Sequence, residues 1–193
     1  MTIIALTGYA QAGKSTVANY LVERHGFTRV SFAAPLKKML RTLNPHIQSG
    51  NGCTRRLSVL WEEYEGNETA IKSSGYGDEY RRLLQVLGTD CIRAVDDNFW
   101  IEAAANQMTD PTASYVFDDC RFPNEAAFIL DRSPEGLWNI SRPGFEPVNG
   151  HISEAHAGNL GETMFLRNDK TVEMLHTDID AALSLAKELE DVL

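Results

Sequence analysis

The stretch GYAQAGKST, residues 8–16, is the part of the sequence whose residue types and spacing point most directly to chemistry. It follows the apolar run TIIALT and places Gly8 four residues before Gly13-Lys14-Ser15. In such a loop, backbone N–H groups bind phosphate oxygens, and the helix that begins near Lys14 adds its positive N-terminal end. Lys14 would reach the β- and γ-phosphates, and Ser15 would hold Mg²⁺. We call residues 8–16 the phosphate loop; its expected nucleotide-binding residues are Gly8, Ala10, Ala12, Gly13, Lys14, Ser15 and Thr16.

Two carboxylates, Asp118 and Asp119, follow the strand-like run SYVF. A carboxylate at the carboxyl end of a strand beside a phosphate loop is where a Mg²⁺-bound water would be held. The spacing alone does not choose between the two. Arg121 and Arg142 also stand where the chain leaves expected strands, and such arginines suit phosphoryl transfer because the transferred group and its neighbours are anionic.

A polar stripe follows the expected helix at residues 79–95. Its members lie at offsets 0, 3, 7 and 11 from the first and contain no acid; they are Arg82, Gln85, Thr89 and Arg93. The opposite side is expected to be apolar, with Tyr80, Leu83, Leu84, Leu87 and Cys91. In a chain of net charge −9, an acid-free stripe with two arginines predicts a bound anion. A plain solvated face is the alternative.

The charge and composition of the chain argue against several classes of binding partner. The net charge of −9 argues against a bulk nucleic-acid or anionic-membrane binder. The three cysteines are widely spaced and form no zinc or redox motif, which is typical of reduced thiols in the cytoplasm. No apolar stretch of membrane-spanning length and no basic leader is seen, so we expect neither secretion nor membrane insertion. His151 and His156 lie five apart in a loop, a spacing that does not favour a metal site.

The order of expected elements predicts an α/β fold. Strands are expected at 2–7, 28–32, 114–117, 137–140 and 163–166, and helices at about 14–25, 34–43, 79–95, 124–131 and 172–189. This alternation favours a parallel sheet with helices on both faces, in a single domain of residues 1–193. Residues 44–78 are expected to be a mobile insertion with one short helix near 61–64, and residues 142–162 a lid-like loop.

Two other nucleotide-binding classes fit less well. The string NDKT at 168–171 has the wrong order for the guanine-reading motif of a GTPase. A mechanical ATPase often has a glutamate after its strand aspartate, whereas Asp119 is followed by Cys120. This favours transfer to an acceptor over hydrolysis.

Several stretches together resemble the phage deoxynucleoside monophosphate kinases, within the P-loop nucleoside monophosphate kinases. They are GYAQAGKST, SFAAPLK, YRRLLQVLGTDCIR, FDDCRFPNEA, ISRPG, HISEAH and FLRNDKTVEML, spread over residues 8–175. The phosphate loop is shared by many enzymes, but RRLLQVLGTD together with DDCRFPNEA is more specific.

The resemblance implies an ATP- and Mg²⁺-dependent kinase that converts dNMP to dNDP for DNA precursor supply, on a three-layer fold with five parallel strands in the order 2-3-1-4-5. It assigns acceptor binding to Phe32, Lys37, Arg82, Gln85 and Arg93. It assigns catalysis to Lys14, Arg82, Asp119, Arg121 and Arg142, metal binding to Ser15 and, through water, Asp119, and the adenine side to Asn168. The chain departs from the family at Ala34, where an aspartate is common, which bears on base or sugar selectivity.

These observations favour direct transfer of a phosphoryl group between two small-molecule substrates, ATP and dNMP. No nucleic-acid or membrane partner is expected, and a homodimer is possible. The cytoplasm, that of the host if the chain is phage-encoded, is the expected location. A kinase of another phosphorylated acceptor, of the phosphomevalonate or dephospho-coenzyme A type, is the nearest alternative. A non-transferring P-loop switch or ATPase is the alternative from another class.

Overall fold

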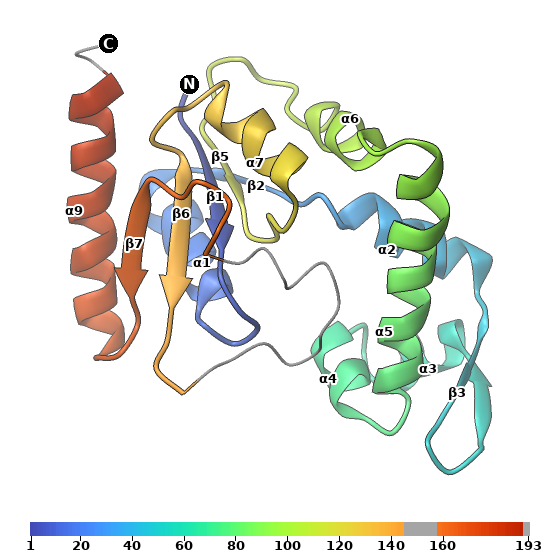
Figure 1. Ribbon diagram of the computed structural model, residues 1–193. Coiled ribbons are helices and arrows are strands. Elements are labelled where there is room, and N and C mark those ends of the chain that lie inside the picture. The colour runs from blue at the N-terminus through green and yellow to red at the C-terminus, as the bar shows by residue number, and fades with distance from the viewer. Residues whose placement is uncertain (145–157, 191–193) are drawn as a thin grey trace. The chain divides into compact units, whose positions relative to one another are not determined.

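A computed structural model describes residues 1–144 and 158–190. The chain forms two compact units. The first, Met1–Phe32 with Ala104–Leu193, contains the large sheet and is called the sheet unit. The second, Ala33–Ala103, is mostly helical and is called the helical unit (Figure 1).

The sheet unit is built on five parallel strands in the order β2-β5-β1-β6-β7. The strands are β1 (Ile3–Thr7), β2 (Thr28–Val30), β5 (Tyr115–Phe117), β6 (Leu137–Ser141) and β7 (Met164–Arg167). When the strands of this sheet alone are numbered along the chain, the order reads 2-3-1-4-5, as expected. The central strand, β1, is buried over its whole length because neighbours cover both of its edges and helices cover both of its faces.

Helices lie on both faces of this sheet (Figure 1). Helices α1 (Lys14–His25) and α9 (Val172–Glu190) pack on one face, where Leu21 and Ile179 join Leu6 and Ile140 in the core. Helix α7 (Pro123–Leu130) packs against β1 and β6 from the other face. Alternate residues of a strand point to opposite faces, so the continuous apolar strands supply both cores. The expected three-layer α/β fold is confirmed.

The helical unit has more regular structure than the sequence predicted. Its elements are α2 (Ala34–Leu43), β3 (His46–Gln48), β4 (Thr54–Arg56), α3 (Leu57–Glu63), α4 (Glu68–Ser73), α5 (Gly77–Gln85), a π-helix (Val86–Arg93) and α6 (Phe99–Ala105), which ends two residues past the boundary. The expectation of one short helix in residues 44–78 was wrong: this segment contains an antiparallel hairpin and two helices. Most of its glycines lie in turns or bends, although Gly77 begins α5, and Ile47, Leu60 and Ile71 are fully buried in a core shared with Tyr80. Helix α6 was not expected at all.

The expected helix at 79–95 is regular only as far as Gln85. From Val86 it continues as a π-helix, in which each turn takes in roughly one residue more than an α-helical turn. Gly88 lies in this segment because a Cβ there would come within 2.7 Å of Leu36 Cδ2 on α2. The Gly88 carbonyl also accepts a hydrogen bond from Trp100 Nε1 at 3.0 Å. Contacts within the helical unit therefore account for this costly mid-helix glycine.

In the described part of the chain, no helix combines the length and the hydropathy that a membrane crossing requires.

Candidate active site

The phosphate loop lies between β1 and α1, where the sequence placed it. Gly8 has φ 118° and Gly13 has φ 110°, values that favour glycine. A Cβ on Gly8 would lie 2.1 Å from the Ile140 carbonyl oxygen, and one on Gly13 would lie 2.4 Å from Asn168 Nδ2. Both glycines are therefore required by backbone conformation and by close approach of neighbouring strands and loops.

The side chain of Lys14 folds back over the loop. Its Nζ donates hydrogen bonds to the carbonyl oxygens of Gly8 at 2.6 Å and Tyr9 at 2.8 Å. Lys14 opens α1, and Ser15 and Thr16 in the same first turn are exposed. The ammonium and the N-terminal N–H groups of α1 thus share one end of the helix, which suits an anion.

The structure separates the two aspartates that the sequence left together. Asp118 pairs with Arg29, whose guanidinium also donates to Asn19 Oδ1 at 2.9 Å. Asp119 instead accepts hydrogen bonds at the end of β2, from Ser31 Oγ at 2.6 Å and from the Phe32 backbone N–H at 3.1 Å. β1 pairs with β5 as Ala5 with Phe117, so this register continued by two residues brings Asp119 level with the end of β1. The two carboxylates therefore have different partners: Arg29 for Asp118 and the end of β2 for Asp119.

The segment after Asp119 is shaped by a buried carboxylate that the sequence analysis did not single out. Glu125, in the first turn of α7, is 3% exposed and accepts backbone hydrogen bonds from Arg121 at 2.8 Å and Phe122 at 3.1 Å. These bonds fix the turn that carries the exposed side chain of Arg121. Arg142 directly follows β6 and is also exposed.

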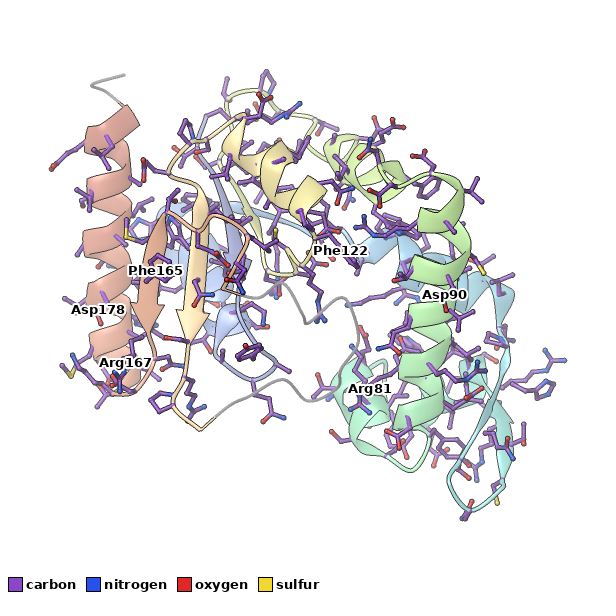
Figure 2. The ribbon with its side chains drawn as sticks, in the orientation of Figure 1. Arg81, Asp90, Phe122, Phe165, Arg167 and Asp178 are labelled. Carbon is purple, nitrogen blue, oxygen red and sulfur yellow. The ribbon has the colours of Figure 1, made fainter. Side chains whose placement is uncertain are left out.

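Asn168 lies directly beside the phosphate loop. Its Nδ2 donates to the Ala12 carbonyl oxygen at 3.0 Å, and its backbone N–H donates to Ser141 at 2.8 Å. Figure 2 marks the preceding residue, Arg167, at the end of β7. These hydrogen bonds join the turn before α9 to the phosphate loop. The sequence did not reveal this contact because the two segments are far apart in the chain.

The polar stripe differs from expectation in its charge. Arg82 is exposed and forms a two-pronged pair with Glu79, through Nε at 2.7 Å and Nη2 at 2.8 Å. Glu79 lies one turn before Arg82 on the same face, so the face is not free of acid. The hydrogen bond from Arg82 is the main reason that the pKa of Glu79 is lowered. The guanidinium is held in an extended, pre-oriented form at an exposed position.

The expectation that Arg93 continues the exposed stripe was also wrong. The Arg93 side chain is 6% exposed, and its Nη1 donates to the backbone and side-chain oxygens of Asp97, both at 3.0 Å. The π-helix is the cause, because its wider turns displace Arg93 by more than about a quarter turn from its α-helical position. Cys91, expected on the apolar side, is exposed for the same reason. Gln85 and Thr89 are half-buried.

The remaining acceptor candidates are Phe32 and Lys37. Phe32 is 3% exposed and stacks on Phe117 with ring centroids 4.7 Å apart, so it belongs to the core of the sheet unit and offers no exposed face for a base.

Lys37, on α2, pairs with Glu68 at 3.0 Å, and Lys72 pairs with the other oxygen of Glu68 at 2.6 Å. Burial alone would raise the pKa of Glu68, but the two lysines outweigh burial and lower it. The sequence analysis did not identify Glu68, because one of its partners, Lys37, lies on another helix. The other partner, Lys72, lies one turn after Glu68 on the same helix.

The structure tests the metal-binding expectations only in part. His151, His156 and most of the lid-like loop fall outside the described residues. Within residues 1–144 and 158–190, no group of three or more His, Cys, Asp or Glu side chains gathers around one point. Ser15 and Asp119, the two residues expected to hold Mg²⁺, carry oxygen donors, which are of the kind that Mg²⁺ prefers.

Comparisons with known proteins give a consistent family. The family model of deoxynucleotide monophosphate kinases matches residues 54–179. A protein of Acanthamoeba polyphaga mimivirus, provisionally named as a deoxynucleotide monophosphate kinase, is 30% identical over 206 aligned positions, which cover 98% of this chain and all of the relative. The deoxynucleotide monophosphate kinase of Escherichia phage RB69 is 28% identical over 125 positions, which cover 62% of this chain and 51% of the relative. The matched region includes most of the helical unit, the Asp119 turn and α7, and the full-length relative extends the similarity over the phosphate loop. The chain therefore belongs to the deoxynucleotide monophosphate kinase family of phosphotransferases.

Proposed function

We propose that this protein transfers the γ-phosphoryl group of ATP to the phosphate of a deoxynucleoside monophosphate, with Mg²⁺, and so supplies diphosphate precursors for DNA. The observation that carries the proposal is the phosphate loop, with two conformationally required glycines and Lys14 folded over it, in a chain of the deoxynucleotide monophosphate kinase family.

In this proposal, the phosphate loop binds the triphosphate of ATP. Its backbone N–H groups and the first turn of α1 point at the phosphate oxygens, and Lys14 exchanges its two carbonyl partners for β- and γ-phosphate oxygens. Asn168 stands on the adenine side, tied to the loop through Ala12. Because these contacts come from strand ends and a helix start, little reorganisation is needed when ATP binds.

Ser15 and Asp119 are the residues proposed to hold Mg²⁺, the first directly and the second through water. A bound Mg²⁺ would neutralise charge on the β- and γ-phosphates. Both donors are oxygens, and Mg²⁺ commonly combines one or two protein ligands with waters and substrate phosphates. The hydrogen bonds that Asp119 accepts from Ser31 and Phe32 fix the orientation of its carboxylate.

The acceptor nucleotide is assigned to the helical unit. Arg82 would bind its phosphate, Gln85 would contact its base, and Lys37 and Arg93 would add positive charge. The acceptor phosphate is largely a dianion at neutral pH, since its second pKa is about 6. One of its oxygens attacks the γ-phosphorus while the bond to the bridging oxygen of ADP breaks, so neither a covalent enzyme intermediate nor a general base is required. Lys14, Arg121 and Arg142 would neutralise charge during transfer.

A substrate panel tests the proposal. ADP and diphosphate formation are followed with ATP and each of the four dNMPs, the four ribonucleoside monophosphates, phosphomevalonate and dephospho-coenzyme A. We expect ADP formation only with nucleoside monophosphates, equal amounts of ADP and nucleoside diphosphate, and no transfer by a Lys14→Ala control. ADP release at the same rate without an acceptor would identify an ATPase, and a response confined to the non-nucleotide phosphates would identify the other kinase class.

A further inference from the structure

A short chain of hydrogen bonds links the base of the phosphate loop to a carboxylate with no role in the proposed transfer. Thr7, the last residue of β1, is fully buried and directly precedes Gly8. Its Oγ1 donates to Glu162 Oε1 at 2.9 Å and accepts from Asn139 Nδ2, on β6, at 3.1 Å. The hydroxyl therefore joins three segments that are far apart in the sequence.

The Glu162 carboxylate also organises the chain that leads into β7. Oε1 accepts from the Gly158 backbone N–H, and Oε2 accepts from the Leu160 backbone N–H, both at 2.9 Å. Gly158 and Gly161 have φ values of 83° and 82°, so this stretch turns twice through the left-handed region around the carboxylate. Hydrogen bonds to an ionised acceptor are stronger than neutral ones, which makes Glu162 a firm anchor for residues 158–162.

The position of Thr7 makes this anchor relevant to phosphate binding. The next residue, Gly8, has no space for a Cβ because the Ile140 carbonyl oxygen is in the way, and Ile140 follows Asn139. Thr7 and Asn139 are also paired directly in the sheet register. A shift of the Thr7 side chain would therefore move the ends of two central strands at the point where the phosphate loop begins.

We propose that Glu162 is a positioning residue that acts through Thr7 to hold the phosphate loop in its anion-binding conformation. The proposal rests on the proposed function, because it takes ATP as the ligand of that loop. Small displacements of a binding constellation are costly when geometry supplies most of the catalysis, as in phosphoryl transfer. Glu162 itself need not contact either substrate.

Four variants and two readouts test this role. Thr7→Val removes the hydroxyl at nearly constant volume, Thr7→Ser keeps it, and Glu162→Gln replaces one accepting oxygen with a donor that faces another N–H. Thr163→Val is the matched control, since the Thr163 hydroxyl donates to the Leu137 carbonyl oxygen at 3.2 Å. The Kd for ATP is measured by titration calorimetry without acceptor, and Tm is measured in parallel.

We expect Thr7→Val and Glu162→Gln each to raise the Kd for ATP about tenfold, and Thr7→Ser to remain within about twofold of the wild type. A fifth variant, which combines Thr7→Val with Glu162→Gln, should be little worse than either single variant, because both changes break one network. Thr163→Val should lower Tm as much as Thr7→Val does while leaving ATP binding unchanged.

The results distinguish this proposal from the proposed function. If the wild type binds ATP and Thr7→Val and Glu162→Gln bind it equally well, the positioning role is overturned and the proposed function stands. If the wild type does not bind ATP, both are overturned. A loss of ATP affinity in Thr163→Val equal to that in Thr7→Val would show a general effect of destabilisation, which also overturns the positioning role.

Discussion

Replacing Arg82 by alanine is the sharpest test of the acceptor assignment. The guanidinium is exposed, and its Nε and Nη2 are paired with Glu79, so an acceptor phosphate would bind at the Nη1 edge or displace the glutamate. A bidentate contact between arginine and a phosphate is charge-assisted and strong, so its loss should lower kcat/KM for the dNMP by about 30- to 1000-fold. Arg82→Lys should recover only part of this loss, because an ammonium keeps the charge but lacks the fork.

Glu79 would compete with the acceptor phosphate for the Arg82 guanidinium. The strength of the ion pair between Glu79 and Arg82 can be judged from its exposure to solvent. Exposed ion pairs are weak and screened by salt, so breaking this pair should change the acceptor KM by less than about fivefold. The Glu79→Gln variant measures this contribution directly. Since its pKa is lowered, Glu79 is charged at neutral pH, and the change to glutamine removes a full charge.

Steady-state kinetics with each substrate varied separately provide the assay. Arg81→Ala is the matched control: Arg81 lies on the same helix (Figure 2), but its side chain donates hydrogen bonds to Asp78 and to the Lys72 carbonyl oxygen. We expect the acceptor KM to rise strongly in Arg82→Ala only, with the Kd for ATP unchanged. An unchanged acceptor KM, an effect confined to ATP, or an equal effect in Arg81→Ala would refute the assignment of Arg82 to the acceptor.

Three further predictions concern the phosphate loop, the metal and the Glu68 cluster. Lys14→Met should lower kcat at least about a hundredfold without changing the circular dichroism spectrum, because the lysine stabilises charge in the transition state; near-normal turnover would contradict its role. Ser15→Ala and Asp119→Asn should raise the Mg²⁺ concentration for half-maximal rate, and Asp118→Asn should do so less, since the Asp118 carboxylate is already paired with Arg29; the reverse order would show that the wrong aspartate was chosen. Glu68 has a lowered pKa, so the stability that its charge provides is present above its ordinary pKa and lost as pH falls through the folded value. Glu68→Gln should therefore flatten the acid side of the Tm–pH curve, measured by calorimetry from pH 7 to 3, and a curve parallel to the wild type would exclude this contribution.

Much of the sheet unit could be predicted from the sequence because its signals are local. Short runs rich in apolar residues marked all five strands, and Gly26, which ends α1, takes a left-handed conformation. The phosphate loop was recognisable because its chemistry depends on residues that are contiguous in the chain. The spacing of these runs also gave the layered α/β class, since alternating strands and helices leave few topologies.

The helical unit was less predictable because its structure depends on contacts between segments. Glycine and serine clusters suggested an irregular insertion, whereas the burial of Ile47, Leu60 and Ile71 in one core supports a hairpin and two helices. Single-helix spacing assumed 3.6 residues per turn, and the π-helix moved Arg93 from the surface to a buried position.

The sequence by itself therefore determined the phosphate loop, the class of fold and the family, since each is encoded by neighbouring residues or by a simple period. Only the tertiary structure gave Asp118 and Asp119 different partners, placed Phe32 in the core, and joined Thr7 to Glu162 across 155 positions. These outcomes depend on which side chains meet after folding. Burial, hydrogen-bond geometry and charge pairing depend on contacts between residues that are distant in the sequence, so a local sequence pattern does not predict them.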